Sequence, residues 1–383
     1  MTEFSNGIDI SNVYIFISDA LRWSALPESI SNKGVTFKTV SAGCATMRSV
    51  SSIVTGLNPP RHGVSSWTDQ LTEPTLFDLP NLNSGFYNPA AGEDGGLNVV
   101  LDQQSKNTLD TIEPPFVYLE RDQGGHAPYA DYSYEEMLSD MDHTKPVISD
   151  HYNSMIKQSV VRFEERLRLL EDRGLREDTL IIFLSDHGEL LGEYGLVSHS
   201  SPPVPELVYV PTVFIHPKIE RNNNVDTIGH IDLMPTISDL LDVQLSNQSF
   251  DGINIFEKSP GPRYNDAMYS RPILRKDRTI YHSNGIWDGE GGHVFTSKGK
   301  LLTPLIGLKK SRGWNRKYWK TNPSEIPMAI RCFASPYRKY GNPQTTKDKA
   351  LKKINTIQNE KGSSKEIKLD DSVEEQLKDL GYR

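Results

Sequence analysis

Leu180–Glu189 reads LIIFLSDHGE, and the first half of this segment has the composition of a buried strand. Its run of β-branched and aromatic apolar residues, bounded by polar ones, predicts a strand covered on both faces. The strand ends in Asp186, His187 and Gly188, and open α/β sheets place their active sites at the carboxyl ends of their strands. Because Gly188 permits a sharp turn, the adjacent Asp and His can both reach one metal ion. The structural alternative is a helix-capping Asp followed by an exposed His.

Composition places the chain among soluble globular proteins. Of its 383 residues, 36% are hydrophobic and 24% are charged, which is ordinary for that class. The net charge of -8 argues against nucleic acid as the main partner, because such a partner requires a basic face. Cys44 and Cys332 are the only cysteines, so no disulfide framework exists. Near the amino terminus only Val13–Ile17 is apolar, which is too short for a membrane span or a signal peptide. We therefore expect a cytoplasmic protein.

Two other apolar runs of strand length are also followed by acidic residues. Val13–Ser18 precedes Asp19, which is either a metal ligand or the N-cap of the next helix. Phe116–Glu120 precedes Asp122 and, after two glycines, His126. The glycines let the backbone fold around an ion. The Asp and His residues that follow these strands are therefore candidate metal ligands.

A small, hydroxyl-rich segment, Ser41–Gly56, carries the candidate nucleophile. Its apolar residues recur at helical spacing, and Gly56 suits the end of a helix. Cys44 and Thr46 lie at the helix start, where amide dipoles lower the cost of a thiolate or alkoxide and bind an anion. Arg48 adds a guanidinium for sulfate or phosphate oxygens. The alternatives are a capping Thr, a Cys that serves only as a small buried hydrophobe, and a solvated Arg.

The remaining pattern indicates alternating helices and strands. Irregular sequence between residues 67 and 111 surrounds a short predicted strand at Leu97–Leu101, and Val210–His216 is a further strand. Tyr152–Arg173 has the apolar stripe of an amphipathic helix and delivers the chain to the central strand, an order that favours a parallel sheet. We interpret His230 and Asp232 as capping and packing residues of the helix that follows them.

His199, in the loop after the central strand, completes the candidate ligands, although a surface His is the alternative. The ligands divide into two sites. One would hold Asp19, Thr46, Asp186 and His187, and the other would hold Asp122, His126 and His199. Oxygen ligands mixed with imidazole suit divalent metals, and two cations a few ångströms apart stabilise the attacking and the leaving oxygen of an in-line displacement. We expect two ions, Zn²⁺ or Mn²⁺, with Ca²⁺ or Mg²⁺ as alternatives.

The ordered motifs resemble the sulfatase branch of the alkaline phosphatase superfamily. They are VYIFISDALR, CATMRSVSSIVTG, PPRHGV, HAPY, GLREDTLIIFLSDHGE, VSH, LVYVPTVFIHP and HIDLMPTISDLL, and the terminal LKDLGYR is similar to the ending of many members. The resemblance implies an α/β fold with a mainly parallel sheet sandwiched between helices in residues 1–250. It also implies a small antiparallel-sheet subdomain in residues 251–383, and transfer or hydrolysis of a phosphoryl or sulfuryl group through a covalent enzyme intermediate.

One position departs from the sulfatase pattern C/S-x-P-S-R, in which the Cys or Ser is converted to formylglycine. In that pattern the converted Cys or Ser lies nine positions before the Thr of a Thr-Gly pair. In this chain the pair is Thr55 and Gly56, and the position nine residues earlier is Thr46, whereas Cys44 lies eleven positions before Thr55. Cys44 keeps Arg48 four residues later, but the Pro and Ser positions differ. Ala20 also stands where many one-metal sulfatases carry a second Asp. The resemblance therefore implies an unmodified Thr46 nucleophile, as in phosphodiesterase and phosphotransferase members, with Cys44 as the alternative.

The predicted activity is a metal-dependent hydrolase that cleaves phosphate or sulfate esters of a small molecule or glycan through Thr46. The first alternatives are a formylglycine sulfatase that uses Cys44, and a phosphomutase or nucleotide pyrophosphatase on the same scaffold. The non-enzymatic alternative is a degenerate member that binds an anion or a carbohydrate. Leaving-group specificity depends on the irregular loops, so the sequence does not separate the enzymatic alternatives.

Beyond residue 251, alternating polar and apolar residues with Gly turns predict the small antiparallel sheet. His282 and His293 are expected on its surface or in its packing. The Lys-rich segment 338–371 predicts a solvated, partly ordered arm before a short final helix, with a basic balance that favours anionic partners.

Overall fold

A seven-stranded sheet forms the centre of the computed structural model, which describes residues 10–88, 95–104, 108–129, 132–199, 201–219, 227–245, 249–273, 276–296 and 313–379. The strand order is β4-β5-β1-β6-β7-β2-β8. The strands are β1 Asn12–Ser18, β2 Val35–Val40, β4 Asn83–Tyr87, β5 Phe116–Asp122, β6 Thr179–Leu184, β7 Tyr209–Ile215 and β8 Thr227–Gly229. Neighbouring strands are parallel except at β7, which runs antiparallel to both β6 and β2. The predicted mainly parallel α/β fold is confirmed.

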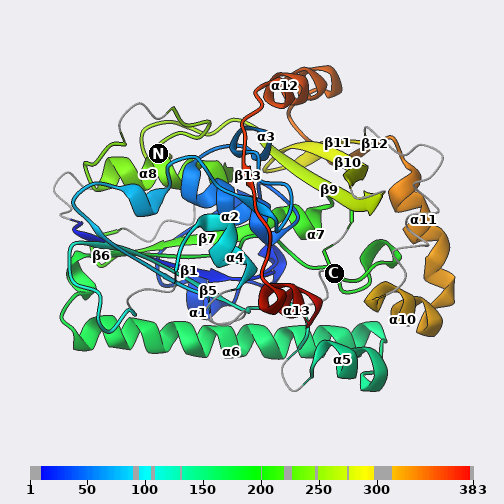
Figure 1. The fold of residues 1–383 in the computed structure, drawn as a ribbon, viewed down its shortest axis with the longest axis horizontal. Coiled ribbons are helices and arrows are strands. Elements are labelled where there is room, and N and C mark those ends of the chain that lie inside the picture. The colour runs from blue at the N-terminus through cyan, green and yellow to red at the C-terminus, as the bar shows by residue number, and fades with distance from the viewer. Residues whose placement is uncertain are drawn as a thin grey trace.

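Helices cover both faces of this sheet because its strands alternate two sets of apolar side chains. On β1, Tyr14 and Phe16 pack into the core under α6 (Lys145–Asp172), whose Phe163 contacts Phe16 with ring centroids 5.2 Å apart. Val13, Ile15 and Ile17 point into the opposite core, which is closed by α2 (Thr46–Thr55), α4 (Gly96–Leu101) and α8 (Leu233–Leu240). Figure 1 shows α6 along one side of the sheet and α2 and α8 along the other.

A second, four-stranded antiparallel sheet follows in the order β12-β11-β10-β9. Its strands are β9 Arg263–Ile273, β10 Lys276–Asp288, β11 Gly291–Thr296 and β12 Tyr337–Gly341. The shorter helices are α1 Glu28–Ser31, α3 Pro59–His62, α5 Tyr134–Asp140, α7 Pro205–Val208, α10 Trp314–Thr321 and α11 Ile326–Ala334. The predicted C-terminal antiparallel sheet is therefore present, while residues 297–312, which include part of its predicted sequence, lie outside the described residues.

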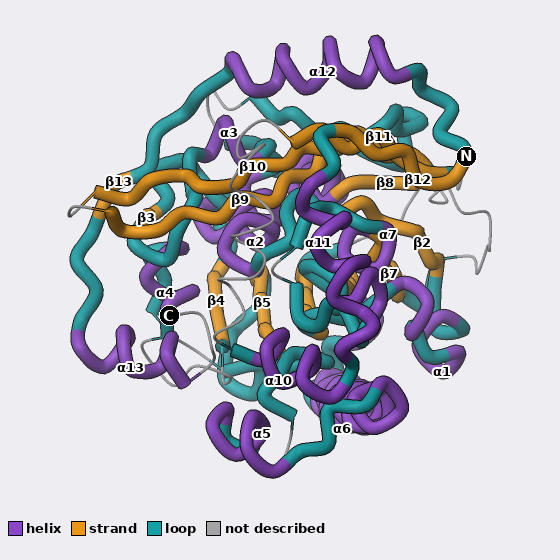
Figure 2. Tube along the Cα trace, turned by 90° about the vertical axis from the view of Figure 1, so that its right-hand side faces the viewer, coloured by secondary structure: helices purple, strands orange, loops and turns teal. Residues whose placement is uncertain are grey.

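The Lys-rich segment 338–371 is more regular than the predicted solvated arm. It contains α12 (Lys347–Asn359), which packs on the second sheet through Ala350 and Ile354, and β13 (Lys365–Glu366), which pairs with β3 (Asp69–Gln70). After it, α13 (Asp371–Asp379) inserts Val373 and Leu377 into the core that contains α2 and α4. Figure 2 shows this chain running from α12 past β13 to α13. The last residues of the terminal motif, 380–383, lie outside the described residues.

One predicted strand is a helix. Leu97–Leu101 belongs to α4, and its Leu97, Val100 and Leu101 side chains are all buried in one core. Their spacing of three and four residues fits one helix face, and a short apolar run does not by itself separate a strand from a helix. The predicted helix at Tyr152–Arg173 is present, but it starts earlier, at Lys145.

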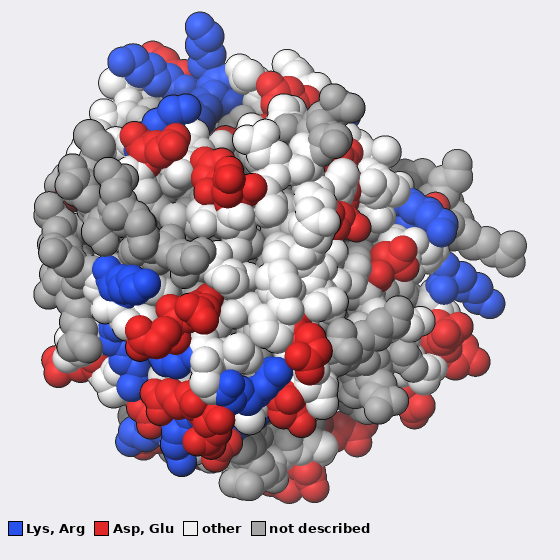
Figure 3. Space-filling view, turned by 90° about the vertical axis from the view of Figure 1, so that its left-hand side faces the viewer, with Lys and Arg blue, Asp and Glu red and all other residues white. Residues whose placement is uncertain are grey.

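Charged side chains of both signs lie on the surface of the molecule (Figure 3). On the face shown in Figure 3, basic and acidic side chains are interspersed, and basic ones gather at the top, where α12 lies. Within the described part of the chain, the search for a helix with enough length and apolar character to cross a bilayer finds no candidate.

Candidate active site

Asp19, Asp186 and His187 meet because their strands are parallel neighbours. β1 ends at Ser18 and β6 ends at Leu184, so the residues that follow both strands emerge at the same edge of the sheet. The Nε2 atom of His187 lies 3.6 Å from Asp19 Oδ1 and 3.7 Å from Asp186 Oδ2. The three ligand atoms lie within 4.8 Å of one another, and all three side chains are fully buried. The structure therefore brings these predicted ligands together.

Two carboxylate oxygens in this cluster point to a cation. Asp186 Oδ1 accepts hydrogen bonds from the backbone N–H groups of Ala20, at 3.2 Å, and His187, at 2.9 Å, and Asp19 Oδ2 accepts one from Arg121. The other oxygens, Asp19 Oδ1 and Asp186 Oδ2, are buried and accept no hydrogen bond from the described residues. Burial and the neighbouring Asp19 carboxylate raise the pKa of Asp186. Because buried carboxylates need a counter-charge, this donor set fits a divalent metal ion.

His187 is oriented as a ligand by its own backbone. Its Nδ1 lies 2.9 Å from the carbonyl oxygen of Gly188, so Nδ1–H donates there and Nε2 faces the two carboxylates. Although burial lowers the pKa of His187, Asp186 and Asp19 outweigh that effect and raise it. Without a metal, these negative charges favour a proton on the ring. With a cation in the cluster, Nε2 is available for coordination.

Thr46 stands beside this cluster as the first residue of α2. Its Oγ1 lies 3.2 Å from His187 Nε2, and its side chain is fully buried. Ala45 is the N-cap of the helix and has no side-chain capping bond, so Thr46 is not used as a cap. The hydroxyl is therefore both next to the candidate metal ligands and at the positive end of a ten-residue helix.

The second predicted group is assembled only in part. The ring centroids of His126 and His199 lie 4.9 Å apart, and those of His187 and His199 lie 4.4 Å apart. Burial, with the nearby His199, lowers the pKa of His126 to about 3, so this ring is neutral and has a lone pair for a ligand. The two predicted histidines thus lie beside His187 and form one continuous imidazole cluster.

Asp122 does not join His126 and His199 in that cluster. Its Oδ2 accepts a hydrogen bond from Arg162 Nε at 2.5 Å, and its Oδ1 accepts from Arg162 Nη2 at 3.0 Å and from the Gly124 N–H at 2.9 Å. In the structure, this ion pair with α6 occupies the Asp122 carboxylate that the sequence predicts for the second site. The sequence could not reveal it, because Arg162 lies forty residues away and its side chain reaches the strand end only after α6 has packed.

Glu189 and Arg121 are site residues that the sequence reasoning missed. Glu189 is buried, its Oε1 lies 3.7 Å from His199 Nδ1, and its Oε2 accepts no hydrogen bond from the described residues. Burial raises the pKa of Glu189 to about 7. Arg121 is buried on β5 and links Asp19 to Asn88. The available signal was position, since Glu189 is the second residue after His187 and Arg121 immediately precedes Asp122.

Arg48 is not directed at an open anion site. Its Nη1 lies 2.5 and 2.6 Å from the two carboxylate oxygens of Asp266 on β9, and both side chains are buried. Arg48 outweighs the effect of burial and lowers the pKa of Asp266 to about 2, so the pair is ionised at neutral pH. The sequence predicts that Arg48 binds sulfate or phosphate oxygens. In the structure, the Arg48 guanidinium is instead paired with the Asp266 carboxylate.

Cys44, the alternative nucleophile, sits in the apolar core with its Sγ 3.6 Å from Asn265 Oδ1. Burial raises the pKa of its thiol well above the usual range, so the thiolate is scarce at neutral pH.

His230, expected to cap or pack a helix, also links the loop before Thr46 to the end of β6. Its Nδ1 accepts from the Ala42 N–H at 3.3 Å and its Nε2 lies 2.9 Å from the Ser185 carbonyl oxygen.

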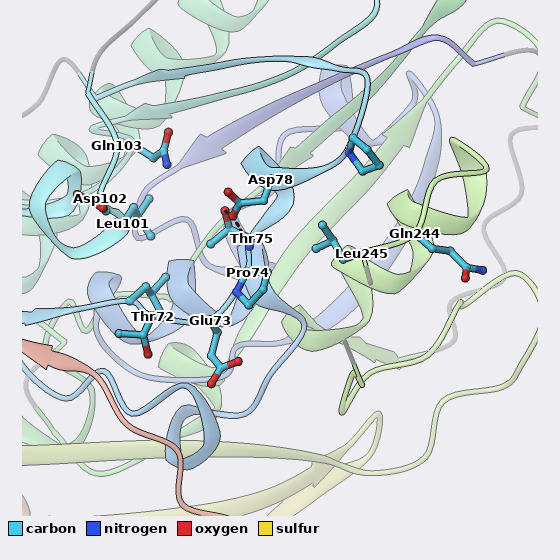
Figure 4. A pocket seen from close by; sticks show the side chains of 12 residues that line it. Thr72, Glu73, Pro74, Thr75, Asp78, Leu101, Asp102, Gln103, Gln244 and Leu245 are labelled. Atoms are coloured by element: carbon cyan, nitrogen blue, oxygen red, sulfur yellow. Dashed lines mark hydrogen bonds between the residues drawn. The ribbon is translucent and has the colours of Figure 1, made fainter. Parts of the chain in front are cut away.

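A cavity of about 550 Å³ lies away from these residues (Figure 4). Its lining includes Glu73, Asp78 and Asp102 and none of the residues predicted for the site. Asp78 accepts hydrogen bonds from the backbone N–H and the hydroxyl of Thr75, and Asp102 accepts one from the side-chain amide of Gln70. The cavity therefore adds no ligand to the chemistry at the sheet edge.

Comparison with known proteins finds a family and a fold that this chain shares. A family model described as Sulfatase matches residues 97–243. "Low-salt glycan biosynthesis sulfotransferase Agl7" of Haloferax volcanii is 32% identical over an alignment that covers 100% of this chain and 98% of that protein. The "Choline-sulfatase" of Rhizobium meliloti is 23% identical over 42% of this chain and 27% of its own.

Solved structures share the fold at low sequence identity. A phosphonate monoester hydrolase of Agrobacterium radiobacter has a TM-score of 0.58 at 13% identity and covers 84% of this chain and 95% of its own. A 2-O GAG sulfatase has a TM-score of 0.57 at 13% identity and covers 88% and 96%. These likenesses show the fold that the chain shares with both structures. The family model and the full-length relative show that the chain belongs to the sulfatase family.

Proposed function

We propose that this protein moves a sulfuryl or phosphoryl group from a donor ester to an acceptor hydroxyl through a covalent intermediate on Thr46. The observation that carries the proposal is the position of Thr46 Oγ1, 3.2 Å from His187 Nε2, next to two buried carboxylate oxygens that accept no hydrogen bond from the described part of the chain. A divalent cation held by Asp19, Asp186 and His187 supplies the Lewis acidity that favours an alkoxide and stabilises the charge of the transferring group.

The residues define a two-step displacement. In the first step Thr46 Oγ1 attacks sulfur or phosphorus, the ester bond to the donor oxygen breaks, and the donor alcohol departs with a proton. In the second step an acceptor oxygen attacks the same atom, the bond to Thr46 breaks, and Thr46 regains a proton. Threonine carries one hydroxyl, so the bound group leaves only when an external nucleophile displaces it.

Burial of the site favours an alcohol over bulk water as that nucleophile. Thr46, Asp19, Asp186 and His187 are fully buried, and His126 and His199 are at most 7% exposed. A dry site suppresses hydrolysis of a reactive intermediate. The full-length relative is named as a glycan biosynthesis sulfotransferase, which supports a sulfuryl group and a glycan hydroxyl as the first pair to test.

We also propose a second cation next to the first, held by His126, His199 and Glu189. Glu189 Oε2, which has no hydrogen-bond partner among the described residues, and the neutral His126 ring supply ligand atoms for this cation. Glu189, next to His199, takes the place that the sequence suggested for Asp122. This retains the predicted two-ion site with a different carboxylate. Zn²⁺ and Mn²⁺ are the first ions to test, because imidazole with carboxylate suits both.

The experiment is to incubate the purified protein and Mn²⁺ or Zn²⁺ with 4-nitrophenyl sulfate or bis(4-nitrophenyl) phosphate, with and without a monosaccharide acceptor. We expect nitrophenol release, a peptide of Thr46 carrying one sulfuryl or phosphoryl group, and a modified sugar. Thr46→Ala is expected to abolish all three, while Cys44→Ala retains them. Formylglycine at residue 44, or a modified Cys44 peptide, contradicts the Thr46 assignment. Nitrophenol release with an unmodified sugar supports hydrolysis instead of transfer.

A further inference from the structure

The loop that carries Thr46 is held by the second sheet. Residues 41–45 form no regular element, and β9 contacts them with two successive residues, Asn265 and Asp266. We propose that Asp266 is a positioning residue for the reaction: it holds this loop and the start of α2 so that Thr46 Oγ1 stays next to His187. The proposal rests on the function above, in which Thr46 is the nucleophile.

The Asp266 side chain fixes α2 two residues after the nucleophile. Arg48 Nη1 contacts both carboxylate oxygens, and the two side chains are 5% and 3% exposed. The Arg48 Nη2 atom lies 3.6 Å from Met268 Sδ, which also belongs to β9. A charged pair with so little exposure is geometrically demanding, because either partner left alone would be a buried charge. The first turn of α2 is therefore bound to one register of β9.

The Asp266 backbone fixes the loop before the nucleophile. Its N–H donates to the Ala42 carbonyl oxygen at 3.0 Å, and its carbonyl oxygen accepts from the Cys44 N–H at 3.0 Å. Gly43 pairs with Asp266 in a short bridge between these bonds. A Cβ on Gly43 would lie 2.8 Å from Arg48 Cβ, so only glycine fits at this contact. Asp266 thus binds the chain before Thr46 through its backbone and after Thr46 through its side chain.

The same loop is connected to the candidate metal ligands. His230 accepts from the Ala42 N–H and contacts the carbonyl oxygen of Ser185, the residue before Asp186. Asn265 donates to the Ser41 carbonyl oxygen at 2.6 Å. A shift of Asp266 would therefore change the distance between Thr46 and His187 without removing any predicted metal ligand. Reacting groups must be held closely, and a displacement of about 1 Å can cost about 10²-fold in rate.

The alternative is that the Arg48–Asp266 pair contributes only stability. The chain offers a matched control in Glu120, a buried carboxylate on β5 that binds Arg166 with three contacts of 2.9 to 3.2 Å. Glu120 accepts hydrogen bonds from Tyr14 on β1 and from Arg166 on α6, and among the described residues it has no hydrogen bond to residues 41–48. Asp266→Asn and Glu120→Gln therefore each remove one buried carboxylate charge that is paired with an Arg, although Arg166 is 29% exposed and Arg48 is 5% exposed, and only Asp266 contacts the loop.

The test compares these two variants in kcat, KM, metal content and hydrogen exchange. We expect Asp266→Asn to lower kcat about 10²-fold with KM and metal content close to the wild-type values, while Glu120→Gln retains kcat. Equal loss of kcat in both variants, or full kcat in Asp266→Asn, overturns the proposal. Faster amide exchange in residues 41–48 of Asp266→Asn alone is also expected, and wild-type exchange there overturns the proposal even if no substrate is found.

A double variant keeps the test decisive if Asp266→Asn does not fold. Arg48→Met with Asp266→Leu removes both charges, and replacing both partners of a buried pair by apolar residues is often tolerated in stability. We expect the folded double variant to lose kcat as Asp266→Asn does. Wild-type kcat in this variant would show that the pair has no positioning role.

Discussion

Replacing Asp186 with asparagine is expected to stabilise the metal-free protein and to reduce its stabilisation by metal to the part contributed by the second proposed ion. Asparagine has the same shape and keeps an oxygen for the Ala20 and His187 N–H groups that Asp186 Oδ1 now accepts. Its amide nitrogen replaces Oδ2, which accepts no hydrogen bond from the residues that the structure describes, and offers a hydrogen bond to Asp19 Oδ1. The variant therefore removes one of two buried negative charges and leaves the backbone contacts intact.

The pH dependence has a definite sign. Burial and Asp19 raise the folded-state pKa of Asp186, so the folded metal-free protein binds this proton more tightly than the unfolded chain does. Its contribution is fully present below the unfolded pKa of about 3.9 and is lost as pH rises through the folded pKa. The wild type therefore suffers this loss as pH rises, and the loss is largest above the folded pKa. Asp186→Asn lacks it, so the variant is expected to melt above the wild type in EDTA.

The effect of metal can be given a magnitude. At a metal concentration about 100 times Kd, binding to the folded state contributes about 2.7 kcal/mol. An unfolding entropy of about 2.1 cal/mol/K per residue gives about 0.8 kcal/mol/K for 383 residues, so the melting temperature of the wild type is expected to rise by about 3 °C. Differential scanning calorimetry with Mn²⁺ or Zn²⁺ and with EDTA measures both effects, and elemental analysis of the same samples gives the metal content.

Asp122→Asn is the matched control, since it removes the carboxylate that Arg162 binds. We expect it to lower the melting temperature equally with and without EDTA and to keep the rise caused by metal. The reasoning is refuted if Asp186→Asn melts below the wild type in EDTA or retains the full wild-type rise caused by metal. If Asp122→Asn loses that rise, the original grouping of Asp122 with His126 and His199 is restored.

Three further predictions address the chemistry. Thr46→Ala is expected to lower turnover by at least about 10³-fold while metal content stays at the wild-type value, whereas Cys44→Ala keeps turnover. Steady-state kinetics and peptide mass spectrometry measure both variants. A fully active Thr46→Ala would disprove the assignment of Thr46 as the nucleophile. Glu189→Gln is expected to reduce bound metal from about two ions to about one per chain by elemental analysis, and an unchanged stoichiometry would remove Glu189 from the second site. Iodoacetamide is expected to leave folded Cys44 unmodified at pH 7 because burial raises the pKa of its thiol; rapid labelling, read by peptide mass, would contradict the buried assignment.

The sequence by itself determined the three strands that lead into the site, Val13–Ser18, Phe116–Glu120 and the first half of Leu180–Glu189, and the residues that follow them. Parallel strands bring their carboxyl ends to one edge, so Asp19, Asp186 and His187 could be placed together from their positions after Val13–Ser18 and Leu180–Leu184. The helix start at Thr46 was readable for the same reason, because local spacing defines a helix and its first turn. The family assignment and the mainly parallel fold followed from these ordered motifs and are confirmed.

Only the tertiary structure decided which charged groups are already paired. Asp122 is bound by Arg162, and Arg48 is bound by Asp266, which lies more than two hundred residues away on the second sheet. Such pairings depend on how elements distant in sequence pack, and spacing along the chain carries no record of them. Packing likewise made a helix of Leu97–Leu101. It also buried Glu189 Oε2, which has no hydrogen-bond partner among the described residues, and burial decides whether a charged residue is solvated or must find a counter-charge.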